Sequence, residues 1–243
     1  MKKVMLIVLV ILVGVIGGAA YVGYTLLQTV KSAVASGCGN GCVREDHGGP
    51  IVLGSGHVTT ESRQVAKFTS IRLESSANVE IDRTGTESLS VTGDDNLLAF
   101  FTSEVKDGTL YLAYAKDKSF QGKLPVYRVT VADLRDIQIR GSGDLQVASF
   151  DGAALSASIA GSGDMRLAGR TDDLTLSIAG SGNIDAAGLK AKRAQVSISG
   201  SGDATVNATD ALDVRISGSG DLRYLGAPKL TQNVSGSGSV RQK

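Results

Sequence analysis

The sequence predicts an all-β protein. Its main part is a single-domain parallel β-helix, a solenoid of about 18–21 residues per coil with Gly-Ser-Gly corners, preceded by an N-terminal transmembrane or signal helix. Gly-Ser-Gly recurs at nearly constant spacing, apolar residues alternate with polar ones on both sides of each copy, and a long uncharged apolar run lies near the N-terminus. The 243 residues include 31 glycines and only 3 prolines, without the strict period of collagen, and 42% are hydrophobic, which is enough to bury a core.

The apolar run covers residues 4–30, carries no charged side chain and follows Lys2 and Lys3. A helix of this length spans a hydrocarbon core of about 30 Å, and positive charges before the run favour a cytoplasmic N-terminus. We therefore expect residues 1–30 to be a transmembrane anchor or a signal peptide, with the chain after about Ser32 outside the cytoplasm.

Three interpretations of this segment stay open. An uncleaved anchor fits the length of the run. A cleaved signal peptide fits the small residues at 17–20 and at 33–35, and a lipoprotein would be acylated on Cys38. Gly14 and Gly18 also stand four residues apart, a spacing that is typical of packed membrane helices.

Residues 31–50 form a Gly-rich polar tether that contains both cysteines of the chain, Cys38 and Cys42. In an oxidising compartment these two form a local disulfide or remain free thiols. A zinc site needs four ligands, and only His47 lies near enough in the sequence to join the two thiolates. We therefore expect no metal in the tether.

Residues 51–243 form the predicted β-helix domain, in which the last six Gly-Ser-Gly copies are separated by 20, 19, 20, 18 and 18 residues. Alternating apolar residues on both sides of a corner predict two short strands per unit, and such a unit buries its apolar face only by stacking on its neighbours. Glycine suits a sharp corner because it adopts positive φ without steric cost. The predicted corner glycines are Gly141, Gly143, Gly161, Gly163, Gly180, Gly182, Gly200, Gly202, Gly218, Gly220, Gly236 and Gly238.

Less regular copies of the pattern extend the prediction upstream. Gly54 begins an isolated Gly-Ser-Gly, and Ser75 and Gly93 each stand where a corner belongs between alternating apolar residues. We therefore expect earlier coils with corners at these three positions. Residues 99–135 are irregular, with a hairpin-like strand pair expected around Asp107-Gly108.

A column of acidic and amide residues follows the corners. One interpretation is structural: each side chain accepts a hydrogen bond from the backbone amides of its own corner. The other is that neighbouring carboxylates share Ca²⁺, for which one acid per coil gives thin coordination, so these aspartates are weak candidates. The column comprises Asn78, Asn96, Asp144, Asp164, Asn183, Asp203 and Asp221, and the Ca²⁺ candidates are Asp144, Asp164, Asp203 and Asp221.

Composition and charge exclude several function classes. The 25 basic and 24 acidic residues give a net charge of +1 without a basic stripe, so we expect no nucleic-acid partner. The absence of tryptophan argues against a cleft that stacks sugars or bases. The histidines, His47 and His57, lie outside the regular repeats, and no nucleophile, base and orienting partner stand at an interpretable spacing. We predict no catalytic residue, no enzyme activity and no cofactor.

Particular segments carry a family resemblance: GDDNLL at 93–98, EVKDGTL at 104–110 and the GSGD repeats. Across about residues 52–241 the chain resembles the auto-transporter adhesin head GIN domain family, DUF2807. The resemblance implies a β-helix related in shape to pectin lyases, export from a bacterium, no recognised catalytic residues and a role in cell adhesion. The last copy departs from the motif, with Ser239 in place of Asp or Asn.

The residues and the resemblance together predict a non-catalytic extracytoplasmic binding module for cell adhesion or cell-envelope interaction. An envelope sensor or scaffold that works with a membrane protein partner is the alternative. The expected location is the bacterial cell envelope, with residues 4–30 in the membrane, and secretion or periplasmic release after signal cleavage is the alternative. The expected surface ligand is a protein or glycan of unknown identity, and a homo-oligomer is left open.

Overall fold

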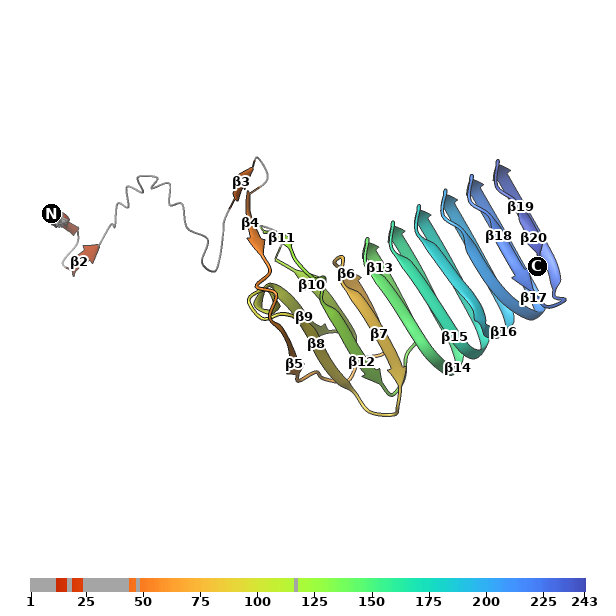
Figure 1. The fold of residues 1–243 in the computed structure, drawn as a ribbon, viewed down its shortest axis with the longest axis horizontal. Helices are drawn as coiled ribbons and strands as arrows, with labels where there is room; N and C mark the ends of the chain where they lie inside the picture. The colour runs from red at the N-terminus through yellow and green to blue at the C-terminus, as the bar shows by residue number, and fades with distance from the viewer. Residues whose placement is uncertain (1–11, 17–18, 24–43, 47–48, 116–117) are drawn as a thin grey trace. The chain divides into compact units, whose positions relative to one another are not determined.

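A computed structural model of the chain describes residues 12–16, 19–23, 44–46, 49–115 and 118–243. The chain divides into two units, residues 1–38 and residues 39–243. Each unit is considered by itself, and the second unit, which we call the head, contains nearly all of the described structure (Figure 1).

In the first unit, the described residues form strands where a helix was expected. β1 (Leu12–Ile16) pairs antiparallel with β2 (Ala19–Gly23). The structure thus does not support the predicted transmembrane or signal helix over residues 4–30. β1 is rich in β-branched valine and isoleucine, which favour extended backbone. Among the described residues, no helix has the length and apolar character needed to cross a bilayer.

The predicted disulfide of Cys38 and Cys42 lies outside the described residues, as do the second cleavage site at 33–35 and His47. The predicted tether is described only from Arg44. There β3 (Arg44–Asp46) pairs antiparallel with β4 (Gly49–Leu53), which pairs parallel with β11 (Ser119–Gln121). The end of the tether is therefore part of a small three-stranded sheet.

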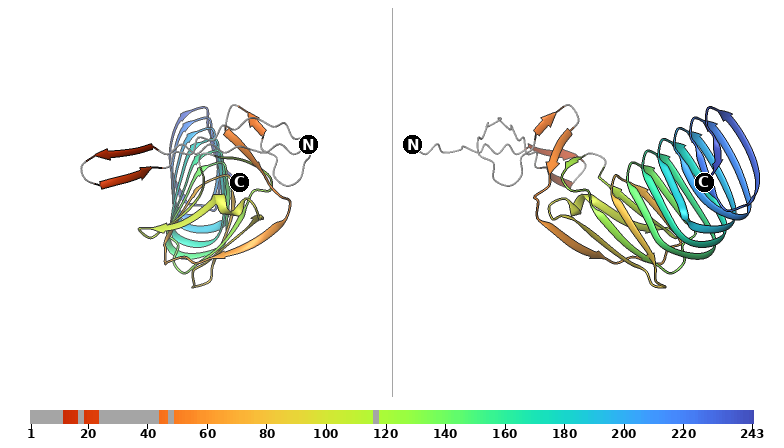
Figure 2. Two further views of the ribbon diagram at one scale, coloured as in Figure 1. Left: turned by 90° about the vertical axis from the view of Figure 1, so that its left-hand side faces the viewer. Right: turned by 45° about the vertical axis from the view of Figure 1, so that its right-hand side comes forward.

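The body of the head is a parallel β-solenoid, as predicted, in which every coil runs along one face, bends, returns along a second face and turns a corner into the next coil (Figures 1 and 2). The long strands contain both faces and the bend between them. The strands of the regular coils are β13 (Asp136–Gly141), β14 (Asp144–Gly161), β15 (Asp164–Gly180), β16 (Asn183–Gly200), β17 (Ala204–Gly218), β18 (Leu222–Leu225), β19 (Lys229–Gly236) and β20 (Val240–Gln242).

Inward-facing aliphatic side chains from successive coils stand in register and form the core. Ile139 pairs with Ile159, and the same column continues through Ile178, Ile198 and Ile216. All five are buried, because each has a neighbouring coil on both sides. The last member, Val234, is 37% exposed, since no further coil of the described chain covers it, and the inward column beside it ends in the polar Gln232.

The corners hold successive coils at a close approach that admits only glycine. Gly161 has a φ of +143°, which L-residues with a Cβ rarely adopt. The Gly141 carbonyl accepts hydrogen bonds from the N–H groups of Ser162 and Gly163, at 3.0 and 3.2 Å. A Cβ on Gly163 would overlap the carbonyl oxygen of Gly143. The same arrangement recurs at each later Gly-Ser-Gly corner.

Of the three upstream corners, the one at Ser75 is confirmed. It joins β6 (Ser70–Glu74) to β7 (Asn78–Arg83), which pair in parallel register with β13 and β14. The Ser75 hydroxyl accepts the N–H of Ala77 at 3.3 Å, so a side chain replaces part of the backbone bonding of the glycine corners.

The predicted coils at Gly93 and Gly54 are wrong. Gly93 lies in β8 (Ser88–Asp94), which pairs antiparallel with β12 (Val126–Val131) and with β5 (Val58–Arg63). Gly54 precedes β5 in the same antiparallel arrangement. The inward residues of β8 are buried as the alternation predicts, but alternation does not distinguish parallel from antiparallel pairing.

The spatial order of the first coils therefore differs from their order in the chain. β6 lies between β13 and β10 (Thr109–Tyr114), and β7 lies between β14 and β12. β9 (Phe101–Lys106), which follows the short 3₁₀ helix Leu98–Phe100, forms the predicted hairpin with β10 through Asp107-Gly108. Phe100, Phe101, Tyr114 and Phe120 pack together in this part of the head.

We expect Gly163→Ala to destabilise the head, because the added Cβ forces adjacent coils apart at the corner. Overpacking of this kind costs about 1–3 kcal/mol. Thermal unfolding of the full chain, followed by circular dichroism, should show a midpoint several degrees lower. Ser162→Ala, at an exposed side chain of the same corner, is the matched control and should leave the midpoint unchanged. An unchanged midpoint for Gly163→Ala would contradict the close-approach explanation.

Candidate functional site

Each regular coil has two edges, the Gly-Ser-Gly corner and the bend between its two faces. The predicted acidic column lies beside the corner. Asp144, Asp164, Asn183, Asp203 and Asp221 follow successive corners, and each side chain accepts a hydrogen bond through Oδ1 from a backbone N–H of the next coil. The donor–acceptor distances are 2.8 to 3.1 Å. The structural interpretation predicted that each side chain would accept from the amides of its own corner. The donors belong instead to the next coil, so the column links neighbouring coils.

The column ends at Ser239. Its N–H and its hydroxyl both donate to Asp221 Oδ1, each at 2.8 Å. These two hydrogen bonds, with the hydroxyl contributing more, lower the pKa of Asp221 from its usual value. Asn183 interrupts the run of carboxylates, and its side-chain amide donates to Asp164 Oδ1 at 2.9 Å, which separates like charges.

Not every predicted member belongs to the column. Asn78 pairs in register with Asp144 and extends the column upstream. Asn96 lies elsewhere: its side chain accepts the N–H of Ser55 and donates to the carbonyl of Leu53. Among the described residues, no group of three or more His, Cys, Asp or Glu side chains is placed to hold a metal ion. Ca²⁺ binding by Asp144, Asp164, Asp203 and Asp221 stays a prediction.

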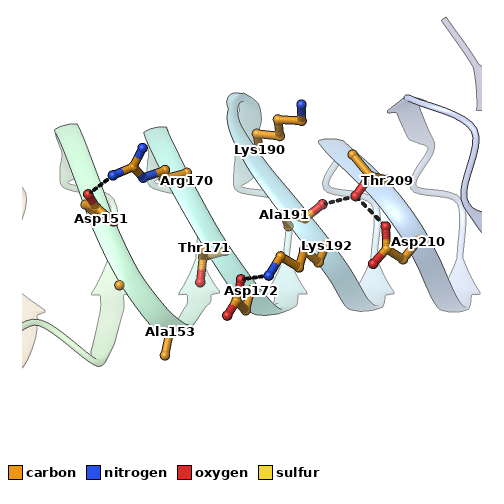
Figure 3. Close-up of a pocket in the computed structure, with 11 residues that line it drawn as sticks. Asp151, Ala153, Arg170, Thr171, Asp172, Lys190, Ala191, Lys192, Thr209 and Asp210 are labelled. Carbon is orange, nitrogen blue, oxygen red and sulfur yellow. Dashed lines mark hydrogen bonds and ion pairs between the residues drawn. The ribbon is translucent and has the colours of Figure 1, made fainter.

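The opposite edge of the coils carries a groove that the sequence did not indicate. It has a volume of about 730 Å³ and crosses the bends of β14, β15, β16 and β17 (Figure 3). Its floor is formed where Gly152, Thr171 and Ala191 pair in register, and Ala208 continues this register on the next coil. Because side chains alternate along a strand, the residues on either side of each floor position both point outward. They form two rows that follow the solenoid axis.

We define these rows by their charged members. The first row consists of Asp151, Arg170 and Lys190, which pair in register on three successive coils. The second row contains Asp172 and Lys192, and on the next coil Thr209 stands beside the floor, with Asp210 one residue further along the strand. Figure 3 shows Arg170 and Asp172 extending to opposite sides of the floor.

Ion pairs within each row run between coils. Arg170 contacts Asp151 at 2.5 Å in the first row, and Lys192 contacts Asp172 at 2.8 Å in the second. The hydrogen bond from Arg170 lowers the pKa of Asp151, and the one to Asp172 raises the pKa of Lys192. All four side chains are largely exposed, so each pair adds little to stability and remains accessible from solution.

A second hollow of about 390 Å³ continues the groove toward the N-terminal coils. It shares Gly152 and Ala153 with the groove and reaches Asp133, Arg135 and Asp173. Asp173 there accepts two hydrogen bonds from Arg193, both at 2.6 Å, and these lower its pKa. The bend edge is thus hollowed across at least the coils from β14 to β17.

The sequence held one signal for this surface. Arg170 and Lys190 are 20 residues apart, as are Asp172 and Lys192, so charged residues recur with the coil period at the bend. Without the register, these charges are indistinguishable from a solvated loop. Within the described part of the chain, we find no nucleophile with a base and an orienting partner along either edge, and the groove offers charged side chains above a floor of small residues.

Comparisons with known proteins bear on this geometry. The family model described as "Putative auto-transporter adhesin, head GIN domain" matches residues 67–228. A crystal structure of a "putative adhesin" from Bacteroides fragilis is 26% identical, with 79% of this chain and 99% of that chain covered and a TM-score of 0.67.

Two structures from Parabacteroides resemble the chain in fold. A "putative adhesin" from Parabacteroides merdae is 21% identical with a TM-score of 0.54, and a "putative lipid binding protein" from Parabacteroides distasonis is 24% identical with a TM-score of 0.51. In both, 79% of this chain and 99% of that chain are covered. No curated protein matches the chain at a significant level.

We expect Asp203→Ala to weaken the link between two coils, because it leaves the N–H of Asp221 without its acceptor. Loss of such a hydrogen bond costs about 0.5–1.5 kcal/mol. Asp203→Asn keeps an Oδ1 acceptor, as Asn183 does in the native column, and should match the wild type. Urea unfolding and amide exchange at Asp221 measure the difference, and equal behaviour of the two variants would refute the role of the column.

Proposed function

The chain belongs to the family of auto-transporter adhesin head GIN domains, and on that premise we propose that its head is a non-catalytic binding module for cell adhesion or cell-envelope interaction. The head displays an exposed surface built jointly by four coils, and this observation carries the proposal. Such a surface suits a ligand that lies along the solenoid axis. The likeness to the Bacteroides fragilis structure supports it.

The arrangement of polar groups in the groove favours binding over chemistry. The charged side chains of the two rows are exposed and several are held in ion pairs, whereas catalytic groups work in sites that exclude water and shift their pKa values strongly. The two side chains of an exposed ion pair readily separate and bind the charges or hydroxyls of a ligand instead. Weak contacts repeated along several coils add up through multivalency.

Presentation at the cell envelope is the second part of the proposal. The uncharged run at residues 4–30 after Lys2 and Lys3 supports export across a membrane. An extracytoplasmic head, retained at the membrane or released by signal cleavage, places the groove where it meets other surfaces.

We expect the groove to be needed for binding to cell surfaces. The labelled full chain, diluted from non-ionic detergent to well below the micelle-forming concentration, is incubated with intact cells and envelope fragments of the producing bacterium. Arg170→Ala with Lys192→Ala should reduce the bound fraction several-fold at fixed protein concentration, since both rows lose a donor. Arg166→Ala with Arg223→Ala changes the net charge equally on an exposed face outside the groove and is the matched control.

Two results would count against the proposal. Equal binding by both double variants would show that the groove is not the adhesive surface. Hydrolysis or modification of envelope polymers by the wild type, but not by the groove variant, would make the protein an enzyme. Circular dichroism of each variant checks that the solenoid is intact.

The mass and partitioning of the native protein test its placement at the envelope. We expect the chain in the membrane or extracytoplasmic fraction, either starting at Met1 or shortened near residues 17–20 or 33–35. An acylated start at Cys38 would assign a lipoprotein. Recovery of an unprocessed chain in the cytoplasmic fraction would refute export.

A further inference from the structure

The first row of the groove continues beyond Asp151 onto the neighbouring strand. Arg83 ends β7, which pairs with β14, so β7 is followed in space by the three strands that carry the row. The hollow of about 390 Å³ contains Arg83 and shares Gly152 with the groove. A further hollow of about 340 Å³ contains Arg83 and shares Asp151. We call Arg83, Asp151, Arg170 and Lys190 the extended row.

Arg83 is held at the β7 end of the extended row by contacts within the head. Its Nε donates to the carbonyl of Ala132 at 3.0 Å, and its guanidinium carbon lies 5.8 Å from the centre of the Phe150 ring. Its Nη1 lies 3.6 Å from the position that a Cβ on Gly152 would occupy, so the guanidinium reaches the floor of the groove. A guanidinium positioned in this way loses little side-chain freedom when it binds a ligand.

The extended row carries an excess of positive charge. Asp151, its one carboxylate, pairs with Arg170 and also lies within electrostatic reach of Arg83. The Lys190 ammonium makes no hydrogen bond or ion pair with another described residue. Lys190 stands in register with Arg170, and like charges on adjacent strands repel. Figure 3 shows these two side chains on the same side of the floor, where an anionic group would offset the repulsion.

The carboxylates on the other side of the floor are largely balanced by cations of their own. Lys192 contacts Asp172 at 2.8 Å. Arg193 donates two hydrogen bonds to Asp173, both at 2.6 Å. Asp210 lies within electrostatic reach of Lys192 and Arg193. The unbalanced positive charge of the groove therefore lies along the extended row.

The surroundings of the extended row narrow the class of ligand. Among the described residues that line the groove and the two hollows, none is aromatic, so neither a base nor a neutral sugar ring finds a stacking partner there. The strands of the floor pair with one another, so an extended peptide finds no open strand edge to join. The groups on offer are guanidinium and ammonium N–H donors, which bind carboxylate and phosphate oxygens.

We propose that the extended row binds a linear polyanion, a polysaccharide or polyol chain that carries carboxylate or phosphate groups. The inference rests on the proposed function, in which the groove is the binding surface, and names the chemical class of its ligand. Neighbouring strands lie about 4.8 Å apart, so a chain laid along the row meets cations on three of four successive strands. Each exposed cation adds a weak contact, and contacts along one chain add up through multivalency.

Three oligomers test the proposal: a mannuronate hexamer, the same hexamer with its carboxylates reduced to alcohols, and a glycerol phosphate hexamer. Calorimetric titration of the full chain in non-ionic detergent gives the affinities, and amide chemical shifts of the labelled chain locate the site. We expect both anionic hexamers to bind at Arg170 and Lys190, more weakly as salt is added. The tighter of the two distinguishes a carboxylate from a phosphate ligand. Equal binding of the reduced hexamer would overturn the proposal.

Variants that change one charge test the sign of the row. Arg170→Gln and Lys190→Gln should each weaken binding of the anionic hexamers about two- to fivefold. Asp151→Asn should tighten it by a similar factor, because Arg170 is released from its ion pair. Weaker binding by Asp151→Asn, or unchanged binding by both cation variants, would overturn the proposal. Lys67→Gln and Asp107→Asn, at exposed positions outside the groove, are the matched controls and should change nothing.

Arg83 needs a separate test because it also contacts Ala132 and Phe150 within the head. Arg83→Gln should weaken binding of the anionic hexamers, and Arg83→Lys, which keeps the charge, should recover most of the affinity. Circular dichroism checks that both variants fold. Wild-type affinity in Arg83→Gln would remove β7 from the site.

The cell-binding experiment separates failure of this inference from failure of the proposed function. If cell binding needs the groove but neither anionic hexamer distinguishes the variants from the wild type, the ligand class is wrong and the adhesive function stands. If the hexamers behave as expected while cell binding ignores the groove, the adhesive function is wrong and the polyanion site stands.

Discussion

The solenoid depends on one close contact between coils, the carbonyl of a corner glycine accepting two N–H groups of the coil above. The Gly141 carbonyl accepts the N–H groups of Ser162 and Gly163 in this way, and no side chain fits between the two coils. Because the contact fixes the position of one coil on the next to within one residue, the Ile139 column becomes a continuous core and the Asp144 column becomes a chain of hydrogen bonds.

The same register produces the groove at the opposite edge. Asp151, Arg170 and Lys190 are distant in sequence, and they form a row only because each occupies the same position of its coil. The bend tolerates differences in length, as the register shifts between β16 and β17 show, so its residues vary while the corner stays constant. The repeated glycine corners at one edge thus hold a bend edge whose charged residues differ from coil to coil.

Much of this fold could be predicted from the sequence because the corner and the core leave periodic signals. The Gly-Ser-Gly copies and the alternation around Ile159 or Ile178 predict stacked coils without further information. The pairing of β8 could not be predicted, since the burial of Val91 is the same for parallel and antiparallel neighbours. The strands at Leu12–Ile16 and Ala19–Gly23 do not support the helix that the uncharged apolar run and the preceding lysines predicted. The charges of the groove could be assigned to rows only once the register between coils was known.

In-register stacking makes the ladder of coils extensible. Each regular coil adds one rung of 18 to 20 residues, with its own corner, its own core residues and one position in each row of the groove. Duplication or deletion of a whole coil would therefore change the length of the groove while leaving the contacts between neighbouring coils chemically the same. A head of this architecture can therefore gain or lose groove length through the insertion or deletion of whole coils, without a redesign of the fold.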